Sequence, residues 1–313
     1  MQACPKYQKT NVSVKTLSMK IINLFILIGM FPFISNSQDL MNLLDSMETN
    51  VPKKEFISGT FKSPRLINGY TCENAGKHDL VFSISHRFNP VKGGVYDLFG
   101  LDESTMRLGF EYGLTDRFSI ALGRSNFNKL YDGYIKWKLI SQSSGEHSFP
   151  LTITWMEGMA VKTVKYVDPS LEYPLTARFY YVHELFIARK FNSRFSAQLV
   201  PTVVHRNMVD EKADQNVVPA LGLGGNFIIN KWLSVNGEYY YLLPGHTADN
   251  HTNSLSVGVE LDSGGGHVFQ IMLSNSNGMT EKAFIPENNG NWTHGDIQLG
   301  FNIIRVFHTK KKK

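Results

Sequence analysis

The sequence has little cysteine, no long apolar run after residue 37, and little net charge once its two ends are set aside. The only cysteines, Cys4 and Cys72, exclude a disulfide framework, a CxxC zinc site and a thiol redox motif. A mean hydropathy of −0.19 is too low for a bundle of membrane helices. It is compatible with a membrane β-barrel, because the strands of such a barrel alternate apolar and polar residues.

The N-terminal residues have the pattern of a cleaved secretory signal. In residues 19–37, Lys20 precedes an apolar run of 14 residues, and the small–x–small tripeptide Ser35–Ser37 follows, which predicts Gln38 as the mature N-terminus. The alternative, a transmembrane helix, needs about 20 apolar residues. Met19 reads as the natural start, so residues 1–18 are interpreted as an upstream extension. No cysteine follows the cleavage site, which argues against a lipoprotein anchor.

The basic character of the chain comes from its ends. Residues 1–37 carry four lysines and no acidic residue, so their removal leaves 28 basic residues against 27 acidic ones. Four of the remaining basic residues form the terminal run Lys310–Lys313. The body of the protein is therefore slightly acidic, and nothing in its charge favours a nucleic-acid partner.

Apolar and polar residues alternate with period two in twelve short segments. In residues 78–88, for example, Leu80 and Phe82 fall on one face, and Ser83 and Arg87 fall on the other. Such alternation is the signature of strands with one face toward lipid and the other toward a polar interior. The twelve predicted strands are 78–88, 105–114, 117–125, 131–141, 149–160, 176–190, 194–206, 216–229, 232–243, 253–262, 266–274 and 295–307.

The connections between these segments alternate between short and long. The short ones are rich in Asn, Asp, Ser and Gly, which tight turns favour. Outer-membrane barrels have short periplasmic turns, long outer loops and an even number of strands, which puts both termini in the periplasm. A soluble β-sheet protein, the alternative, has no reason to sort its loops in this way. We therefore predict an all-β, antiparallel, up-and-down transmembrane β-barrel over residues 78–307, exported to the outer membrane, with a basic tail at 308–313.

Residues 38–77 stand apart from the alternating pattern. Residues 39–50 read as a short helix, and residues 56–71 have β character with turn signals at Ser63-Pro64 and Asn68-Gly69. Two positions are open for this segment: it rests on the periplasmic mouth of the barrel, or it enters the lumen as a plug.

Several strings carry a family resemblance: TFKSPRLINGY (60–70), ISHRF (84–88), GLDESTMRLGFEYG (100–113), VHRN (204–207), GGHVFQIMLSNSNGMTEKAFI (265–285) and GDIQLGFNIIRVF (295–307). Together, over roughly residues 50–307, they resemble the Bacteroidetes-type outer-membrane β-barrel family called domain of unknown function 5777. The resemblance implies an outer-membrane barrel, and it implies no activity, substrate or catalytic residue. One departure is that residues 308–313 follow Phe307, the aromatic residue that the assembly machinery would read.

Charged residues gather on the predicted inner face. One interpretation is that they pair and hydrate inside a packed lumen, and the other is that they line a path for a polar solute. Their mixed signs favour the paired interior. The candidates are Arg87, Arg107, Glu111, Lys136, Lys138, Arg178, Glu184, Arg206, Glu238 and Glu260.

The sequence gives little support for a catalytic site or a metal site. His267 with Ser274–Asn277 could form a Ser/His/Asn site of a lipid-modifying enzyme, but a nucleophile and its base must lie within hydrogen-bond reach. His86, His183 and His205 fall on or near the apolar faces and are interpreted as interfacial residues or strand-end caps, and no pair of them has the spacing of a metal site. We therefore expect no cofactor. The loops 161–175 and 275–294 read as long exposed surfaces.

The favoured function is a non-enzymatic outer-membrane barrel: a narrow channel, a solute-uptake component or a scaffold for a periplasmic partner. The alternatives are a lipid-modifying enzyme and a structural or adhesive surface protein. The expected partners are outer-membrane lipid, the barrel-assembly machinery and, for the scaffold, a periplasmic protein.

Overall fold

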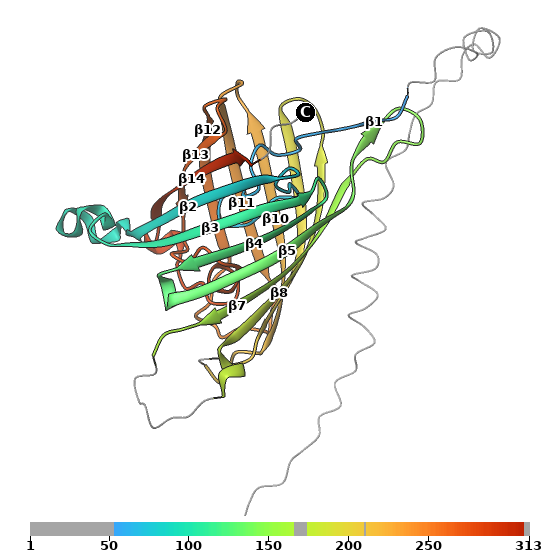
Figure 1. Ribbon diagram of the computed structural model, residues 1–313. Helices are drawn as coiled ribbons and strands as arrows, with labels where there is room; N and C mark the ends of the chain where they lie inside the picture. Colours follow the sequence, from blue (N-terminus) through green and yellow to red (C-terminus); the bar gives the residue numbers. More distant parts are fainter. Residues whose placement is uncertain (1–52, 166–173, 210, 310–313) are drawn as a thin grey trace, which may run out of the picture. The chain divides into compact units, whose positions relative to one another are not determined.

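Twelve antiparallel strands close into a single barrel, as the sequence predicts (Figure 1). The computed structural model describes residues 53–165, 174–209 and 211–309, so the signal segment, the helix expected at 39–50 and the lysine run lie outside it. Each strand pairs with its neighbours in chain order, and the last strand pairs with the first. The strands are β2 (Asp79–Pro90), β3 (Ser104–Thr115), β4 (Phe118–Ser125), β5 (Leu130–Ile140), β7 (Thr152–Lys162), β8 (Phe179–Lys190), β9 (Phe195–Arg206), β10 (Val217–Ile228), β11 (Leu233–Leu242), β12 (Ser254–Asp262), β13 (His267–Ser274) and β14 (Gln298–His308).

The two faces of the barrel wall have opposite chemistry. On β13, Phe269 and Ile271 point outward and are exposed, whereas Gln270 and Ser274 point inward and are buried. The other strands also expose apolar side chains around the outside, and they bury polar side chains, together with some apolar ones, inside. An apolar outer wall of this extent is stable only in an apolar solvent, so the barrel is suited to a bilayer.

Both ends of the barrel sequence lie at the mouth that carries the short turns. His308 at the end of β14 pairs with Asp79 at the start of β2, and its Nδ1 lies 2.7 Å from the Asp79 Oδ1. The same mouth holds a small separate sheet, in which β1 (Glu55–Phe56) pairs with β6 (Ser143–Ser144) in the connection between β5 and β7. We call this end the short-turn mouth and the opposite end the long-loop mouth.

Three strands, β7, β8 and β14, begin three residues later than the alternation predicts. The segment expected at 176–190 becomes a strand only at Phe179, because Leu175–Arg178 form a 3₁₀ turn, η3. The segment expected at 295–307 starts at Gln298, because the preceding turn ends at Gly295 with a φ of 75°. Alternation continues through such turns in the sequence, and only the backbone geometry separates them from the strands.

The long connections contain short helices. They are η1 (Val91–Gly100), η2 (Phe127–Lys129), η3, α3 (Glu281–Phe284) and η4 (Trp292–His294). None of the helices in the described residues is long and apolar enough to cross a membrane.

Gly113 on β3 is a position where a side chain has no room. A Cβ at this position would meet the backbone carbonyls of Ala75 and Gly76, because the chain passes against β3 just before it enters β2. The contact is fixed by the bridge between Lys77 and Gly113 and by a 2.8 Å hydrogen bond from the His78 amide to the Gly113 carbonyl. This close approach brings the N-terminal segment to the inner wall of the barrel.

Candidate functional site in the barrel lumen

Residues 60–77 form a hairpin that lies inside the barrel. Its tip closes with a 2.9 Å hydrogen bond from the Leu66 amide to the Gly69 carbonyl, and Arg65 bridges to Tyr70 across it. The Asn68-Gly69 turn signal therefore marks the tip of a lumenal hairpin. Of the two positions open for this segment, its described part occupies the lumen. We call residues 60–77 the plug hairpin.

Asn68, at the tip, is completely buried and is held by four strands. Its side-chain Oδ1 accepts hydrogen bonds from Arg87 Nε at 3.0 Å and Nη2 at 2.7 Å. Its Nδ2 donates to the hydroxyls of Ser256 and Ser274, each at 3.0 Å, and its backbone amide donates to Glu238 Oε1 at 2.7 Å. Every hydrogen-bonding group of this amide side chain is therefore matched by the barrel wall.

The backbone of the plug hairpin is held by side chains of the wall. A buried carbonyl without a ladder partner needs another donor, and Asn, Gln, Thr and Lys side chains supply it here. With the contacts of Asn68, nine of the twelve strands hydrogen-bond to the plug hairpin. These bonds join Arg65 O to Gln270, Leu66 O to Asn236, Ile67 O to Asn302, Tyr70 O to Gln198, Cys72 O to Thr154, Glu73 O to Lys136 and the Ala75 amide to Glu111, at 2.6–3.3 Å.

One side of the lumen is apolar, which the sequence analysis did not predict. Phe61 and Leu66 of the plug hairpin pack in a cluster with Met156, Phe186 and Val200, which point inward from β7, β8 and β9. Burial of a side chain of this size contributes roughly 1.5–3 kcal/mol. The signal was present in β8, where apolar residues occur on both faces, a pattern typical of a strand buried on both sides.

The predicted lumenal charges lie inside the barrel, with one exception. Arg87, Arg107, Glu111, Lys136, Glu184, Arg206, Glu238 and Glu260 are each less than 5% exposed, and Lys138 is partly buried. Arg178 differs: it lies in η3, before β8 begins, and donates to the carbonyls of Lys162 and Val164. Arg178 therefore links the two ends of the connection between β7 and β8, and it does not belong to the wall of the lumen.

Opposite charges pair within the lumen. Arg107 forms an ion pair with Asp132, and Lys136 lies 3.7 Å from Glu111. Lys138 reaches Glu73 of the plug hairpin at 2.9 Å. Such pairs are stable out of water only when further hydrogen bonds complete them. Glu111 meets this condition, because it also accepts from a serine and a tyrosine hydroxyl at 2.7 Å.

A second segment enters the lumen from the long-loop mouth. The connection between β13 and β14, expected to be an exposed surface over 275–294, is largely buried from Asn275 to Pro286, and α3 lies within it. The Phe284 ring packs edge-on against Tyr240, with centroids 5.0 Å apart. The plug hairpin meets this segment where Arg65 Nη1 donates to the Met279 carbonyl at 3.1 Å. We call residues 275–297 the inner loop.

Together the plug hairpin and the inner loop fill the middle of the barrel. Two cavities beside them, one at Arg65 and Glu111 and the other at Met156 and Glu281, measure about 20 Å³ each. That volume holds about one water molecule. Burial raises the pKa of Glu281, the acidic residue of α3.

A polar cluster joins three loops at the long-loop mouth. Arg206 lies 3.4 Å from Asp214 and 3.5 Å from Glu287, and His251 lies 3.3 Å from Asp214. Burial acts to raise the pKa of Asp214, but the Ala248 amide, Arg206 and His251 outweigh it and hold that pKa below its usual value. We call Arg206, Asp214, His251 and Glu287 the mouth cluster, and its contact with Glu287 connects it to the inner loop.

The residues considered for a Ser/His/Asn site are not brought together. His267 opens β13 at the short-turn mouth and contacts Arg305, whereas Ser274 ends the same strand at the other mouth. Seven strand steps of about 3.3 Å separate them, far beyond hydrogen-bond reach. The Ser276 hydroxyl instead donates to the Gly278 carbonyl at 3.3 Å.

The three other histidines considered as candidates lie on the outer wall. His86 stacks on Phe301, His183 pairs with Glu157, and His205 lies beside Tyr181. Among the residues that the structure describes, no group of three or more His, Cys, Asp or Glu side chains is placed to hold a metal ion.

The chain is similar to several solved structures of porins and channels. No curated protein matches the sequence. Among solved structures, the NanC porin is 8% identical over 72% of this chain and 98% of its own, with a TM-score of 0.45. The KdgM porin is 8% identical over the same shares, with a TM-score of 0.43. The COG4313 outer membrane channel from Pseudomonas putida F1 is 13% identical over 75% of this chain and 97% of its own, with a TM-score of 0.45.

The family comparison covers most of the chain. The model described as the membrane bound beta barrel domain, DUF5777, matches residues 61–307, a span that begins within the plug hairpin and ends at the last barrel strand. The chain therefore belongs to the DUF5777 family of membrane-bound β-barrel domains.

Proposed function

We propose that the protein is an outer-membrane channel for small polar solutes, and that the plug hairpin and the inner loop close it in this structure. The observation that carries the proposal is the way the plug hairpin is held. It makes no continuous ladder with any barrel strand, and side chains of nine strands bind it instead. A segment held in this way can leave while the barrel ladders stay intact.

The path of the plug hairpin supports this proposal. The chain enters near the turn between β10 and β11, where Lys62 Nζ donates to the Lys231 carbonyl at 3.1 Å, and it leaves at His78 beside β3. Both points lie at the short-turn mouth, so the hairpin can withdraw without threading through the barrel. By the usual orientation of outer-membrane barrels, this mouth faces the periplasm.

The wall behind the plug hairpin also suits a water-filled state. Withdrawal would uncover Arg87, Glu238 and Asn302 on one side, and these groups can be hydrated. A lumen that is permanently filled has no need of so many ionisable groups, because burying charge costs more than burying apolar residues of the same volume.

The alternative is a permanently filled barrel that serves as a scaffold. The apolar cluster of Phe61, Leu66 and Phe186 favours it, because withdrawal would expose these side chains to water. The two functions differ in what happens when the filling segments are removed.

Planar-bilayer conductance separates the two functions. We expect little current from the intact protein and a stepwise current from a variant that lacks residues 60–76 and carries a Gly/Ser linker in place of residues 278–285. In a variant that carries only the Gly/Ser linker and keeps the plug hairpin, an engineered disulfide, Asn68→Cys with Ser274→Cys in a Cys72→Ser background, should suppress the current until a reductant is added. If the shortened barrel keeps its β-sheet circular dichroism yet carries no current, the channel proposal is wrong and the scaffold stands.

A further inference from the structure

Two buried charges of the lumen wall, Arg87 and Glu238, are held by neutral groups. Arg87, on β2, donates to carbonyl and amide oxygens, and Glu238, on β11, accepts from backbone amides. Each is at most 3% exposed, and neither forms an ion pair with a residue that the structure describes. Arg107 and Lys136 differ, because each has an acidic partner. A buried charge without a counter-ion is costly, so an ion of opposite sign would stabilise both groups.

The tip of the plug hairpin spans the gap between these two charges. Three strands separate β2 from β11 around the barrel, yet Asn68 reaches both side chains. Its Oδ1 accepts from Arg87 at 2.7 and 3.0 Å, and its backbone amide donates to Glu238 Oε1 at 2.7 Å. The next amide, of Gly69, donates to Oε2 of the same carboxylate at 3.1 Å. The tip therefore offers an acceptor to the cation of the wall and two donors to its anion.

Two hydroxyls complete the surroundings of Asn68. Ser256 and Ser274 each accept from its Nδ2 at 3.0 Å. A hydroxyl rotates and can donate as well as accept, so the pocket that receives this carboxamide can also receive a carboxylate. We call Arg87, Ser256, Ser274 and Glu238 the tip site.

The tip site matches a zwitterion better than it matches the neutral hairpin tip. A hydrogen bond from a guanidinium to a carboxylate is about twice as strong as one to a neutral amide. The same holds for a bond from an ammonium group to Glu238. A solute that carries both charges with the spacing of the Asn68 groups would thus supply the two counter-ions that the wall lacks.

The position of the tip site suits a solute that enters from the long-loop mouth. Ser274 is the last residue of β13, Ser256 is the third residue of β12, and Arg87 lies three residues before the end of β2. The inner loop covers the site on this side, because the Ser276 amide donates to the Ser274 hydroxyl at 3.1 Å. The solute therefore meets the tip site once the inner loop has moved.

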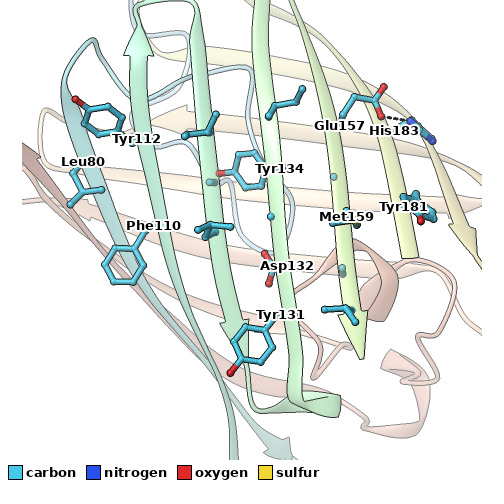
Figure 2. A pocket seen from close by; sticks show the side chains of 18 residues that line it. Leu80, Phe110, Tyr112, Tyr131, Asp132, Tyr134, Glu157, Met159, Tyr181 and His183 are labelled. Carbon is cyan, nitrogen blue, oxygen red and sulfur yellow. Dashed lines mark hydrogen bonds and ion pairs between the residues drawn. The ribbon is translucent and has the colours of Figure 1, made fainter. Parts of the chain in front are cut away.

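The outer wall has a different chemistry. A hollow of about 750 Å³ over β2 to β8 is lined mostly by apolar side chains, among them Leu80, Phe110 and Met159 (Figure 2). Within it, Glu157 and His183 are already paired with each other, as the dashed line in Figure 2 marks. Such a face suits acyl chains, so the place for a polar solute is the lumen.

We propose that the tip site is the specificity site of the channel, and that it takes short peptides with an acidic side chain next to a free amino group. The carboxylate binds Arg87 and the two serine hydroxyls, while the amino group and the following peptide amide bind Glu238. The peptide thus takes the place of Asn68 and Gly69, and the hairpin tip acts as a built-in competitor. This inference rests on the proposed withdrawal of the plug hairpin and adds the substrate class.

The full-length protein in detergent can test this competition. Cys72 is completely buried in the plug hairpin, so a polar maleimide reaches it only after the hairpin has left. A solute that binds the vacated tip site stabilises the released state and raises the labelling rate. In a Cys4→Ser background, we expect aspartyl-glycine at ten times its dissociation constant to raise that rate about tenfold.

Matched solutes test each charge of the ligand. Asparaginyl-glycine lacks the carboxylate of the side chain, and N-acetyl-aspartyl-glycine lacks the ammonium group. We expect each to need a concentration about tenfold higher than aspartyl-glycine for the same labelling rate. Maltose, a neutral solute of similar polarity, should have no effect.

Two wall variants test which group binds which charge. Arg87→Gln should remove the preference for aspartyl-glycine over asparaginyl-glycine, and Glu238→Gln should remove the preference over the N-acetyl form. Both substitutions also loosen the hairpin and raise the rate without solute, so the ratio between two solutes is the measure. Glu184→Gln is the matched control, because Glu184 accepts from Thr202 and makes no hydrogen bond to the described part of the hairpin. It should keep both preferences.

The outcomes separate this inference from the channel function. If no solute changes the labelling rate, or if maltose acts as strongly as aspartyl-glycine, the tip site is not a peptide site, even when the shortened barrel conducts. If the peptide preferences appear and the shortened barrel carries no current, the tip site binds peptides in a barrel that is not a channel. Heat-modifiable migration of each variant in gels reports whether the barrel has folded.

Discussion

Asn68 and Arg87 are joined by two hydrogen bonds, of 3.0 and 2.7 Å, deep inside the barrel. One residue belongs to the tip of the plug hairpin and the other to the first barrel strand. The amide oxygen of Asn68 thus satisfies two donors of a completely buried guanidinium. This pair joins the plug hairpin to the barrel wall, and the first prediction concerns it.

Asn68→Ala should loosen the plug hairpin. The substitution removes the single acceptor of two Arg87 hydrogen bonds and the amide donor to both serine hydroxyls, which costs about 2–4 kcal/mol. We expect the midpoint of urea unfolding in detergent to fall. The midpoint for release of the plug hairpin should fall more than the midpoint for unfolding of the barrel. Ser85→Ala, which removes a buried hydroxyl on the same strand that makes no hydrogen bond in the structure, is the control. An unchanged midpoint in Asn68→Ala would show that the tip contributes nothing.

Cys72 offers a native reporter of the plug hairpin. It is completely buried in the lumen, and burial raises the pKa of its thiol, so a polar maleimide should label it only when the hairpin leaves. In a Cys4→Ser background, the folded protein should resist labelling at neutral pH, and Asn68→Ala should label faster. Rapid labelling of the intact protein would contradict the packed lumen described above.

The sequence predicted the barrel better than it predicted the filling of the barrel. Strand number and loop order follow from alternation and turn residues, which are local, and β13 shows both clearly. The position of the plug hairpin depends on partners far away in the chain, such as Asn68 with Ser274, and no local pattern encodes them. The inner loop was misread for the same reason, because its polar residues bond inside the barrel and not to water.

Glu281→Gln should stabilise the protein at neutral pH. Burial raises the folded-state pKa of Glu281 above its unfolded value, so the ionised form is disfavoured in the fold. Its charge therefore costs stability above the folded pKa, and the cost disappears as the pH falls through that value. We expect thermal melts to show Glu281→Gln above the wild type at pH 8 and equal to it in acid. A lower melting temperature at pH 8 would contradict the assignment.

Asp214→Asn should have the opposite dependence on pH. The folded-state pKa of Asp214 is lowered, so its charge contributes stability that is present above the unfolded pKa, about 3.9, and is lost as the pH falls through the folded pKa. The wild type should therefore melt at a higher temperature than Asp214→Asn at pH 7. The corresponding difference in the free energy of unfolding should be roughly 1 kcal/mol. The difference should shrink in strong acid. Asp249 is a nearby acidic residue that forms no ion pair with the mouth cluster in the structure. The control variant Asp249→Asn should therefore show no such trend.

Gly113→Val should displace the returning strand of the plug hairpin while leaving the barrel able to form. Valine is favoured in strands, but its side chain would overlap the carbonyls of Ala75 and Gly76. The hairpin has to move away from β3, and the hydrogen bond from the Ala75 amide to Glu111 is lost with it. We therefore expect faster labelling of Cys72 with an unchanged heat-modifiable shift of the barrel. Gly237→Val, in open space on the outer wall, should label like the wild type, and equal labelling of the two variants would mean that the Gly113 contact does not position the hairpin.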